Sequence, residues 1–318
     1  MSVLVFVEQS EGEIKKSSRE AVSYAAAMGT GDVVAIVIGS ADSGELSSLG
    51  KNGANKVLHA SSDRLAKGVI RAYSSVIVQA LDKEGSDTLV LAGSSIGNPV
   101  AARVAVKTDA ALASNIVDLP DTSSGFKVKR SIYTGKAFAI TSLEGSKRIL
   151  SLKKGAASLK EDGSDATVES FDPSLDDADF GVNITSEEKT TGQVLLPEAD
   201  IVVSGGRGLK GPENWGMIEE LASELGAATG CSKPVSDMDW RPHHEHVGQT
   251  GIKVAPTLYI AVGISGAIQH LAGVNSSKYI VVINKDADAP FFKAADYGIV
   301  GDAFEVLPKL TEAIKAAK

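Results

Sequence analysis

Small and polar residues alternate in two short stretches near the end of the chain. This composition is typical of loops whose backbone binds a ligand. The first is Val247-Gly248-Gln249-Thr250-Gly251, and the second is Gly263-Ile264-Ser265-Gly266-Ala267-Ile268-Gln269-His270. Glycine lets a ligand approach the backbone closely because it has no side chain. Hydroxyl, amide and imidazole groups then supply hydrogen-bond partners at fixed points between the glycines. Together the two stretches indicate a pocket for a flat cofactor with polar edges.

The second half of the chain is expected to form the sheet that positions these stretches. Short apolar runs, each followed by small or polar residues, predict strands at residues 201–203, 258–262, 279–283 and 297–300. Ligands of open parallel sheets lie beyond the carboxyl ends of the strands, which makes a nucleotide-type site the leading hypothesis. Pro212 and Gly266 are each expected to open a helix, and a helix N-terminus suits a pyrophosphate. Arg207, Asn284 and Asp302 stand in the turns after three of these runs.

The first half alternates strand-like and helix-like segments, which predicts a parallel sheet wrapped by helices. Strands are expected at residues 3–7, 33–38, 56–59 and 88–92, and helices at 18–28, 64–81 and 99–112. Residues 116–152 change to partly alternating runs, including 136–141 and 148–152, which favours antiparallel additions to the sheet. The fold class is therefore α/β with two domains. The polar stretch 159–197 is expected to be an exposed connection, with a boundary near residue 190.

The predicted domains are an N-terminal Rossmann-like α/β scaffold over residues 1–190 and a C-terminal doubly wound domain over 191–318. Composition is that of a globular protein: of 318 residues, 43% are hydrophobic and 23% are charged. The net charge of −8 argues against nucleic acid as a partner, because phosphate binding needs a basic face. The single cysteine, Cys231, fits a reducing cytosol. Because no signal peptide is recognisable and residues 255–274 contain polar groups, we expect neither secretion nor membrane insertion.

Two other motifs suggest different chemistry. Gly93-Ser94-Ser95-Ile96-Gly97 is a formal G-x-S-x-G match after a strand, as a hydrolase nucleophile would require. The histidines that follow it all lie near the glycine-rich stretches, so a plain helix entry is the favoured interpretation. His243, His244 and His246 could suggest a metal, but their segment has no clear helix and a loop is expected.

The glycine-rich stretches resemble the electron-transfer flavoprotein alpha subunit. The resemblance is carried by residues 203–209, 247–251, 259–273, 283–286 and 295–302, in the order and spacing of the family. Over residues 1–190 it rests on length and on the order of strands and helices. The resemblance implies FAD held mainly by the C-terminal domain. The implied cofactor-binding residues are Arg207, Ser232, Lys233, Val247, Gly248, Gln249, Thr250, Ser265, Gly266, Ala267, Ile268, Gln269, His270, Asn284 and Asp302.

The resemblance also implies roles within this set. The Thr250 hydroxyl would lie near N5 of the flavin, residues 265–270 would hold phosphate and the pyrimidine edge, and Asn284 with Asp302 would bind the adenosine end. We expect His270 to stabilise negative charge on a reduced flavin, because its protonation can respond near neutral pH. The family usually has arginine at position 233, and lysine cannot stack its plane on the ring as arginine can.

For function, the resemblance implies an electron carrier without a catalytic residue, a metal ligand or an organic substrate of its own. It would pair with a beta subunit, which has a place for AMP or a second FAD. Electrons would come from flavin dehydrogenases such as the acyl-CoA dehydrogenases of fatty acid beta-oxidation and pass to a membrane quinone oxidoreductase, with the carrier in a bacterial cytoplasm. The alternatives are an electron-bifurcating NADH-linked flavoprotein, a nicotinamide-dependent dehydrogenase and a serine hydrolase built on Ser95.

Overall fold

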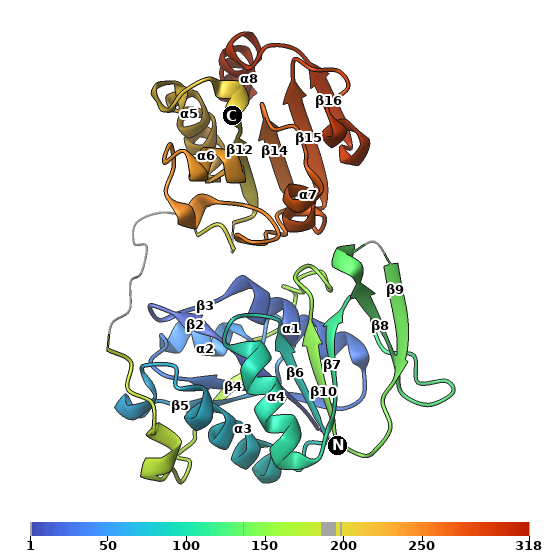
Figure 1. Cartoon of the computed structure of the whole chain (residues 1–318). Coiled ribbons are helices and arrows are strands. Elements are labelled where there is room, and N and C mark those ends of the chain that lie inside the picture. The colour runs from blue at the N-terminus through green and yellow to red at the C-terminus, as the bar shows by residue number, and fades with distance from the viewer. Residues whose placement is uncertain (1, 136, 186–194, 198, 318) are drawn as a thin grey trace. The chain divides into compact units, whose positions relative to one another are not determined.

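The structure, a computed structural model, describes residues 2–135, 137–185, 195–197 and 199–317. The chain divides into two compact units, Met1–Glu187 and Glu188–Lys318, and each has its own sheet (Figure 1). The domain boundary expected near residue 190 falls within residues 186–194, which lie outside the described residues. None of the helices over the described ranges is long and apolar enough to cross a membrane.

The first unit is built on a mostly parallel nine-stranded sheet with the order β11-β5-β4-β1-β6-β10-β7-β8-β9. Its inner strands are buried on both faces, which is why their sequences are continuous apolar runs. The strands are β1 (Ser2–Val7), β4 (Asp32–Ile38), β5 (Lys56–Ala60), β6 (Thr88–Ala92), β7 (Ala111–Ile116), β8 (Lys127–Ile132), β9 (Ala137–Ser142), β10 (Arg148–Leu152) and β11 (Thr167–Ser170), and β2 (Gln9–Ser10) pairs separately with β3 (Glu13–Ile14).

The expected antiparallel additions are confirmed for β8 and β9 and wrong for β10. Strand β8 pairs antiparallel with β7 and β9, whereas β10 lies parallel between β6 and β7. The expected strand at 136–141 begins with Lys136, which lies outside the described residues. Part of the supposed exposed connection is ordered as well, because β11 pairs parallel with β5 at the sheet edge. Strand β11 forms through backbone hydrogen bonds to β5, although most of its side chains are polar.

Helices cover both faces of this sheet (Figure 1). One apolar core joins Val3 and Val5 of β1 to α1 and α2, and another joins Leu4 and Phe6 to α3 and α4. The alternation of side chains along β1 therefore feeds two separate cores. The helices are α1 (Lys16–Met28), α2 (Ser43–Ser48), α3 (Ile70–Glu84) and α4 (Gly97–Thr108), with short 3-10 turns η1 (Asp63–Leu65), η2 (Tyr133–Gly135) and η3 (Asp177–Phe180).

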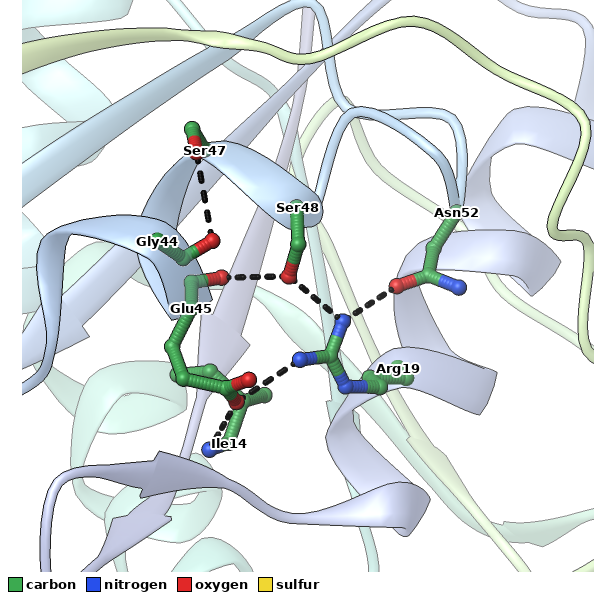
Figure 2. A network of polar contacts seen from close by, with 7 residues as sticks. All are labelled: Ile14, Arg19, Gly44, Glu45, Ser47, Ser48 and Asn52. Carbon is green, nitrogen blue, oxygen red and sulfur yellow. Dashed lines mark hydrogen bonds and ion pairs between the residues drawn. The ribbon is translucent and has the colours of Figure 1, made fainter.

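A polar network fixes α1 against α2 (Figure 2). The Arg19 guanidinium donates to the Glu45 carboxylate at 2.7 Å, to Asn52 Oδ1 at 2.9 Å and to Ser48 Oγ at 3.0 Å. The same Glu45 carboxylate accepts the Ile14 backbone N–H at 2.9 Å. One arginine thus joins α1, α2 and, through Glu45, β3. We assign this network a structural role in the first unit.

The second unit has a fully parallel five-stranded sheet with the order β13-β12-β14-β15-β16. It contains β12 (Ile201–Gly205), β13 (Ala228–Cys231), β14 (Leu258–Val262), β15 (Tyr279–Asn284), β16 (Tyr297–Val300), α5 (Gly216–Leu225), α6 (Lys233–Asp237), α7 (Ile268–Val274), α8 (Ala303–Ala317), and the 3-10 turns η4 (Arg207–Leu209), η5 (Pro212–Asn214), η6 (His243–Glu245) and η7 (Pro290–Ala294). The core on one face includes α5 and α8, and the core on the other includes Val274 of α7 and Phe291 of η7. This is the doubly wound arrangement that the sequence predicts.

Glycines bring the carboxyl ends of β12 and β14 into backbone contact. The Gly208 N–H donates to the Gly263 carbonyl at 3.1 Å, and a Cβ atom added at Gly206 would lie 2.2 Å from that same oxygen. No side chain fits between the two turns at this distance, so glycine is required by space at position 206.

We expect Gly206→Ala to lower the free energy of unfolding by about 1–3 kcal/mol, because the two turns must separate to admit a methyl group. Gly216→Ala is the matched control, since an added Cβ there meets no atom within 4 Å and alanine is the better helix residue. Urea unfolding followed by tryptophan fluorescence reports on this unit, which contains both tryptophans, Trp215 and Trp240. Equal stability of the two variants would contradict the steric argument.

Candidate functional site

The carboxyl ends of the parallel strands in the second unit form one continuous edge, and hydrogen bonds between backbones join the turns that follow them. Ser232 N–H donates to Gly205 O at 3.0 Å, Gly206 N–H to Val262 O at 2.9 Å, Gly263 N–H to Ile283 O at 2.9 Å and Gly301 N–H to Asn284 O at 3.0 Å. Each candidate residue from the sequence lies on or beside this edge, which is where ligands bind in sheets of this kind.

The loop from Val247 to Ile252 is attached to two neighbours. Val247 N–H donates to the Cys231 carbonyl of β13 at 2.9 Å, and Gln249 N–H donates to the Gln269 carbonyl of α7 at 2.7 Å. The Val247 side chain is fully buried, whereas Gln249 and Thr250 are exposed. The loop therefore uses its first residue for the core and leaves an amide and a hydroxyl side chain exposed.

The segment from Ser265 to His270 lies next to this loop. Ser265, Ala267, Ile268 and Gln269 are exposed, while Gly266 and His270 are buried. Gly266 has a φ of +83°, and a Cβ added to it would lie 2.5 Å from the backbone of Phe291. Glycine is needed there for both conformation and space.

The remaining candidates occupy the other turns of the edge. Arg207 is exposed at the start of η4, and Ser232 is buried just before α6. Lys233 is 58% exposed in its side chain and its Nζ lies 3.4 Å from Asp237, so the cation is weakly held. Asn284 donates from Nδ2 to the Ile264 carbonyl at 3.1 Å. Asp302 accepts the Phe304 N–H at 3.0 Å, which caps the start of α8.

Burial dominates the electrostatics of His270. The side chain is 6% exposed, and its Nε2 atom lies 2.8 Å from the Tyr259 hydroxyl. Burial lowers the pKa of His270 to about 4, with a further lowering by the nearby His246. The sequence-based expectation that His270 titrates near neutral pH therefore does not hold in this structure. A neutral imidazole can still act as a hydrogen-bond donor through one nitrogen.

Sequence reasoning missed two buried contacts that pack behind this edge. Tyr259, on the buried strand β14, is fully buried beside His270, and burial raises the pKa of its hydroxyl so that it stays neutral. Arg241 donates to both oxygens of the buried Glu245 carboxylate, at 2.9 and 2.6 Å. The spacing of Arg241 and Glu245 by four residues was the available signal, because such pairs often meet on one turn of chain.

A cavity, a possible metal site and the single thiol of this unit were considered as other sites for chemistry. A cavity of about 600 Å³ is lined by residues of α5, β13 and η6 and of the segments beside them, including Ala222, Thr229 and Arg241. Among the residues that the structure describes, no three His, Cys, Asp or Glu side chains gather as a metal site would require. The buried thiol of Cys231 has a pKa raised by burial to about 12, so it is unreactive.

The G-x-S-x-G turn lies in the first unit and is a helix entry. Ser94, rather than Ser95, holds the turn, since its hydroxyl accepts the Gly97 N–H at 2.7 Å and contacts the Glu8 carboxylate. Ser95 is exposed. His59, the histidine of this unit, places its Nε2 atom 2.8 Å from the Gly39 carbonyl. The structure thus gives the turn a structural role.

Two family models match the chain. The first, described as an electron transfer flavoprotein domain, matches residues 3–176. The second, described as an electron transfer flavoprotein FAD-binding domain, matches residues 195–275. The second range contains the 247–252 loop and the 265–270 segment, which geometry had already placed together.

Several proteins named electron transfer flavoprotein subunit alpha are similar to this chain over almost its whole length. The Bacillus subtilis protein is 38% identical over 316 residues, which is 98% of this chain and 97% of the relative. The Syntrophomonas wolfei protein is 36% identical over 312 residues, and the Mycobacterium tuberculosis protein is 37% identical over 317 residues. Coverage is 98% of both chains in the former comparison and 99% of both in the latter.

Fold and site together define a two-domain α/β flavoprotein. The chain belongs to the electron transfer flavoprotein alpha subunit family, and the resemblance seen in the sequence is confirmed. The donor set also fits a flavin nucleotide, because the buried Nδ1 atom of His270 has no hydrogen-bond partner among the described residues. Gly248 lies beside this histidine, since a Cβ added there would lie 3.7 Å from the Cα atom of His270.

The lowered pKa of His270 predicts a pH-dependent stability. In the unfolded chain the group has its ordinary pKa of 6.5, and in the folded protein its pKa is about 4. The unfolded chain therefore takes up the proton first, so the fold loses stability as the pH falls from about 6.5 to about 4. The size of the shift corresponds to about 3 kcal/mol.

The measurement is the free energy of urea unfolding for the wild type and for His270→Gln at a series of pH values. The difference between the two proteins should change by about 3 kcal/mol over that interval, because glutamine takes up no proton. His244→Gln, at an exposed position, should follow the wild type. A constant difference across the interval would show that His270 is not buried in its neutral form.

Proposed function

We propose that this chain is the FAD-bearing subunit of a heterodimeric electron carrier. The single observation that supports this most strongly is the convergence of the candidate residues on one strand-end edge, where all of them except Asn284 and Asp302 lie within the range matched by the FAD-binding model. FAD would supply the chemistry, since flavins accept and donate single electrons. The protein would bind the cofactor, orient it and tune its charge.

The proposed roles are those that the family resemblance implies, and Gln249, Thr250 and Ser265 are exposed on the edge. Gln249 and Thr250 would face the isoalloxazine ring, Ser265 to Gln269 would hold the pyrophosphate, and Asn284 with Asp302 would bind the adenosine end. Arg207, exposed at a turn, would bring positive charge to the cofactor. His270 would meet the flavin as a neutral donor, because burial lowers its pKa.

The partner we propose is a beta subunit, because the relatives are named alpha subunits. That partner would hold AMP or a second FAD. The proposed donors are flavin dehydrogenases such as acyl-CoA dehydrogenases, and the proposed acceptor is a membrane quinone oxidoreductase in a bacterium, with the carrier in the cytoplasm. A carrier rather than an enzyme with its own substrate is consistent with the names of the relatives.

The test is a visible spectrum and a reductive titration of the chain co-expressed with its beta subunit. We expect flavin absorbance, reduction by one electron and then a second, and reduction by a catalytic amount of an acyl-CoA dehydrogenase with its substrate. Counting flavins per heterodimer distinguishes a simple carrier, with one, from a bifurcating protein, with a second. A colourless complex that binds NAD would refute the proposal.

A second prediction concerns Lys233, where the family usually has arginine. Its exposed ammonium is expected to raise the flavin potential, since a nearby cation favours the reduced, more negative cofactor. Lys233→Ala should therefore lower the one-electron potentials, and Lys233→Arg should preserve them. Lys315→Ala is the matched control, because Lys315 also forms an exposed ion pair, with Glu220. If Lys233→Ala leaves both potentials unchanged, the cation has no such role.

A further inference from the structure

His246 is a buried histidine that the proposed flavin contacts do not use. It follows η6 and is only 2% exposed, whereas its neighbours His243 and His244 are exposed. Its ring centroid lies 5.5 Å from that of His243. The three histidines that look like one cluster in the sequence therefore separate into one internal and two surface side chains.

The His246 ring is packed inside the loop that presents Gln249 and Thr250. A Cβ added at Gly251 would lie 2.7 Å from His246 Nδ1, and one added at Gly248 would lie 3.2 Å from Nε2. The glycines on either side of Gln249 and Thr250 thus contact opposite edges of one imidazole. At these distances neither position accepts a larger residue without displacing the ring.

The backbone of His246 closes the same loop. Its carbonyl accepts the Ile252 N–H at 2.8 Å, and the Ile252 carbonyl accepts the Gly248 N–H at 3.1 Å. On the other side, Arg241 holds Glu245 by two hydrogen bonds and anchors the residue directly before His246. The ring, the closed backbone and the Arg241 anchor together determine where Gln249 and Thr250 lie.

The surroundings of His246 disfavour a proton on its ring. Burial is the main cause of its lowered pKa, and the nearby His243 and Lys233 lower it further. Asp237 of α6 acts in the opposite direction, but it is shared with Lys233.

The remaining ionisable groups around the ring give a proton little compensation. His270 of α7 is neutral, and its own pKa is lowered in part by His246. The Glu245 carboxylate is engaged by Arg241. Within the described residues, the buried Nδ1 atom of His246 has no hydrogen-bond partner.

We propose that His246 is a positioning residue of the flavin site, whose neutral imidazole holds the Val247–Ile252 loop in its binding geometry and releases it on protonation. The inference rests on the proposed function, because it assigns the loop to flavin. Protonation would place a positive charge on a buried ring whose pKa Lys233 already lowers, and opening the loop would let water solvate that charge. The binding geometry is therefore coupled to the neutral state of one side chain.

The sign of the pH effect follows from this coupling. When the loop is open, His246 has its ordinary pKa of about 6.5, and when the loop is closed its pKa is lower. FAD affinity should be constant above about pH 6.5 and should weaken below it. If the loop is open in the FAD-free protein and the closed loop takes up no proton, the dissociation constant rises about tenfold between about pH 7.5 and about pH 5.5. This interval lies above the titration of His270, whose pKa is about 4.

The experiment measures FAD release from the co-expressed complex by ultrafiltration and absorbance across that pH range. His246→Gln cannot take up a proton, so its dissociation constant for FAD should change less than about threefold over the interval. At the acid end of the interval the variant should therefore bind FAD more tightly than the wild type does. His244→Gln is the matched control at an exposed histidine of the same segment and should retain the tenfold change.

Two further variants separate positioning from folding. Arg241→Gln loosens the loop from its other anchor, so it should weaken FAD binding at every pH and keep the pH dependence. His243→Gln removes a group that lowers the pKa of His246 in the closed loop, so it should make the acid weakening of FAD binding smaller. Circular dichroism of each variant checks that the domain is folded.

The proposal is overturned if His246→Gln retains the wild-type pH profile, or if the wild type shows no weakening down to about pH 5.5. A complex that binds no FAD at any pH would instead refute the proposed function. The two failures are therefore distinguishable in the same data set.

Discussion

The backbone contact between Gly206, Gly208 and Gly263 is the constraint on which the candidate site depends. It brings the carboxyl ends of β12 and β14 close enough for a direct N–H to carbonyl bond between turns. The turn with Arg207 and the turn with Ser265 then share one edge. If side chains separated these turns, the strands could still pair, because ladder bonds do not depend on the turns. The sheet would survive, but the surface that a dinucleotide must span would be divided.

The charge of the candidate site depends on two buried histidines. Both His246 and His270 are almost fully buried, and burial lowers the pKa of each. Neither ring therefore carries a permanent charge near neutral pH. Positive charge must come from exposed groups such as Arg207 and Lys233, which water and salt screen. In the proposed flavin site, neutral buried imidazoles would fix the geometry, and exposed cations would balance negative charge on the cofactor.

The sequence predicted most of this architecture because the strands that hold the site are apolar runs ending in glycine or polar residues. It failed where position depends on distant pairing. Residues 148–152 follow antiparallel strands in the chain, yet β10 inserts parallel between β6 and β7, and no local pattern specifies that register. His246 was grouped with His243 and His244 because the three stand close together in the sequence, and local loop packing was not visible there. Only the fold of Gly248 and Gly251 around its ring distinguishes the buried histidine from the exposed ones.

The first unit has a strand-end edge of the same kind, and its side chains explain why the ligand chemistry belongs to the second. Strand β1 lies between β4 and β6, so the order in which strands are added to the sheet reverses at β1, and a crevice for ligands is expected there. Glu8, only 6% exposed, follows β1 and contacts Ser94, whose hydroxyl also accepts the Gly97 N–H that opens α4. A carboxylate and a hydroxyl thus occupy the place where a phosphate would lie, and the carboxylate would repel it. In the second unit the turns that follow β12 and β14 contain glycines and no carboxylate.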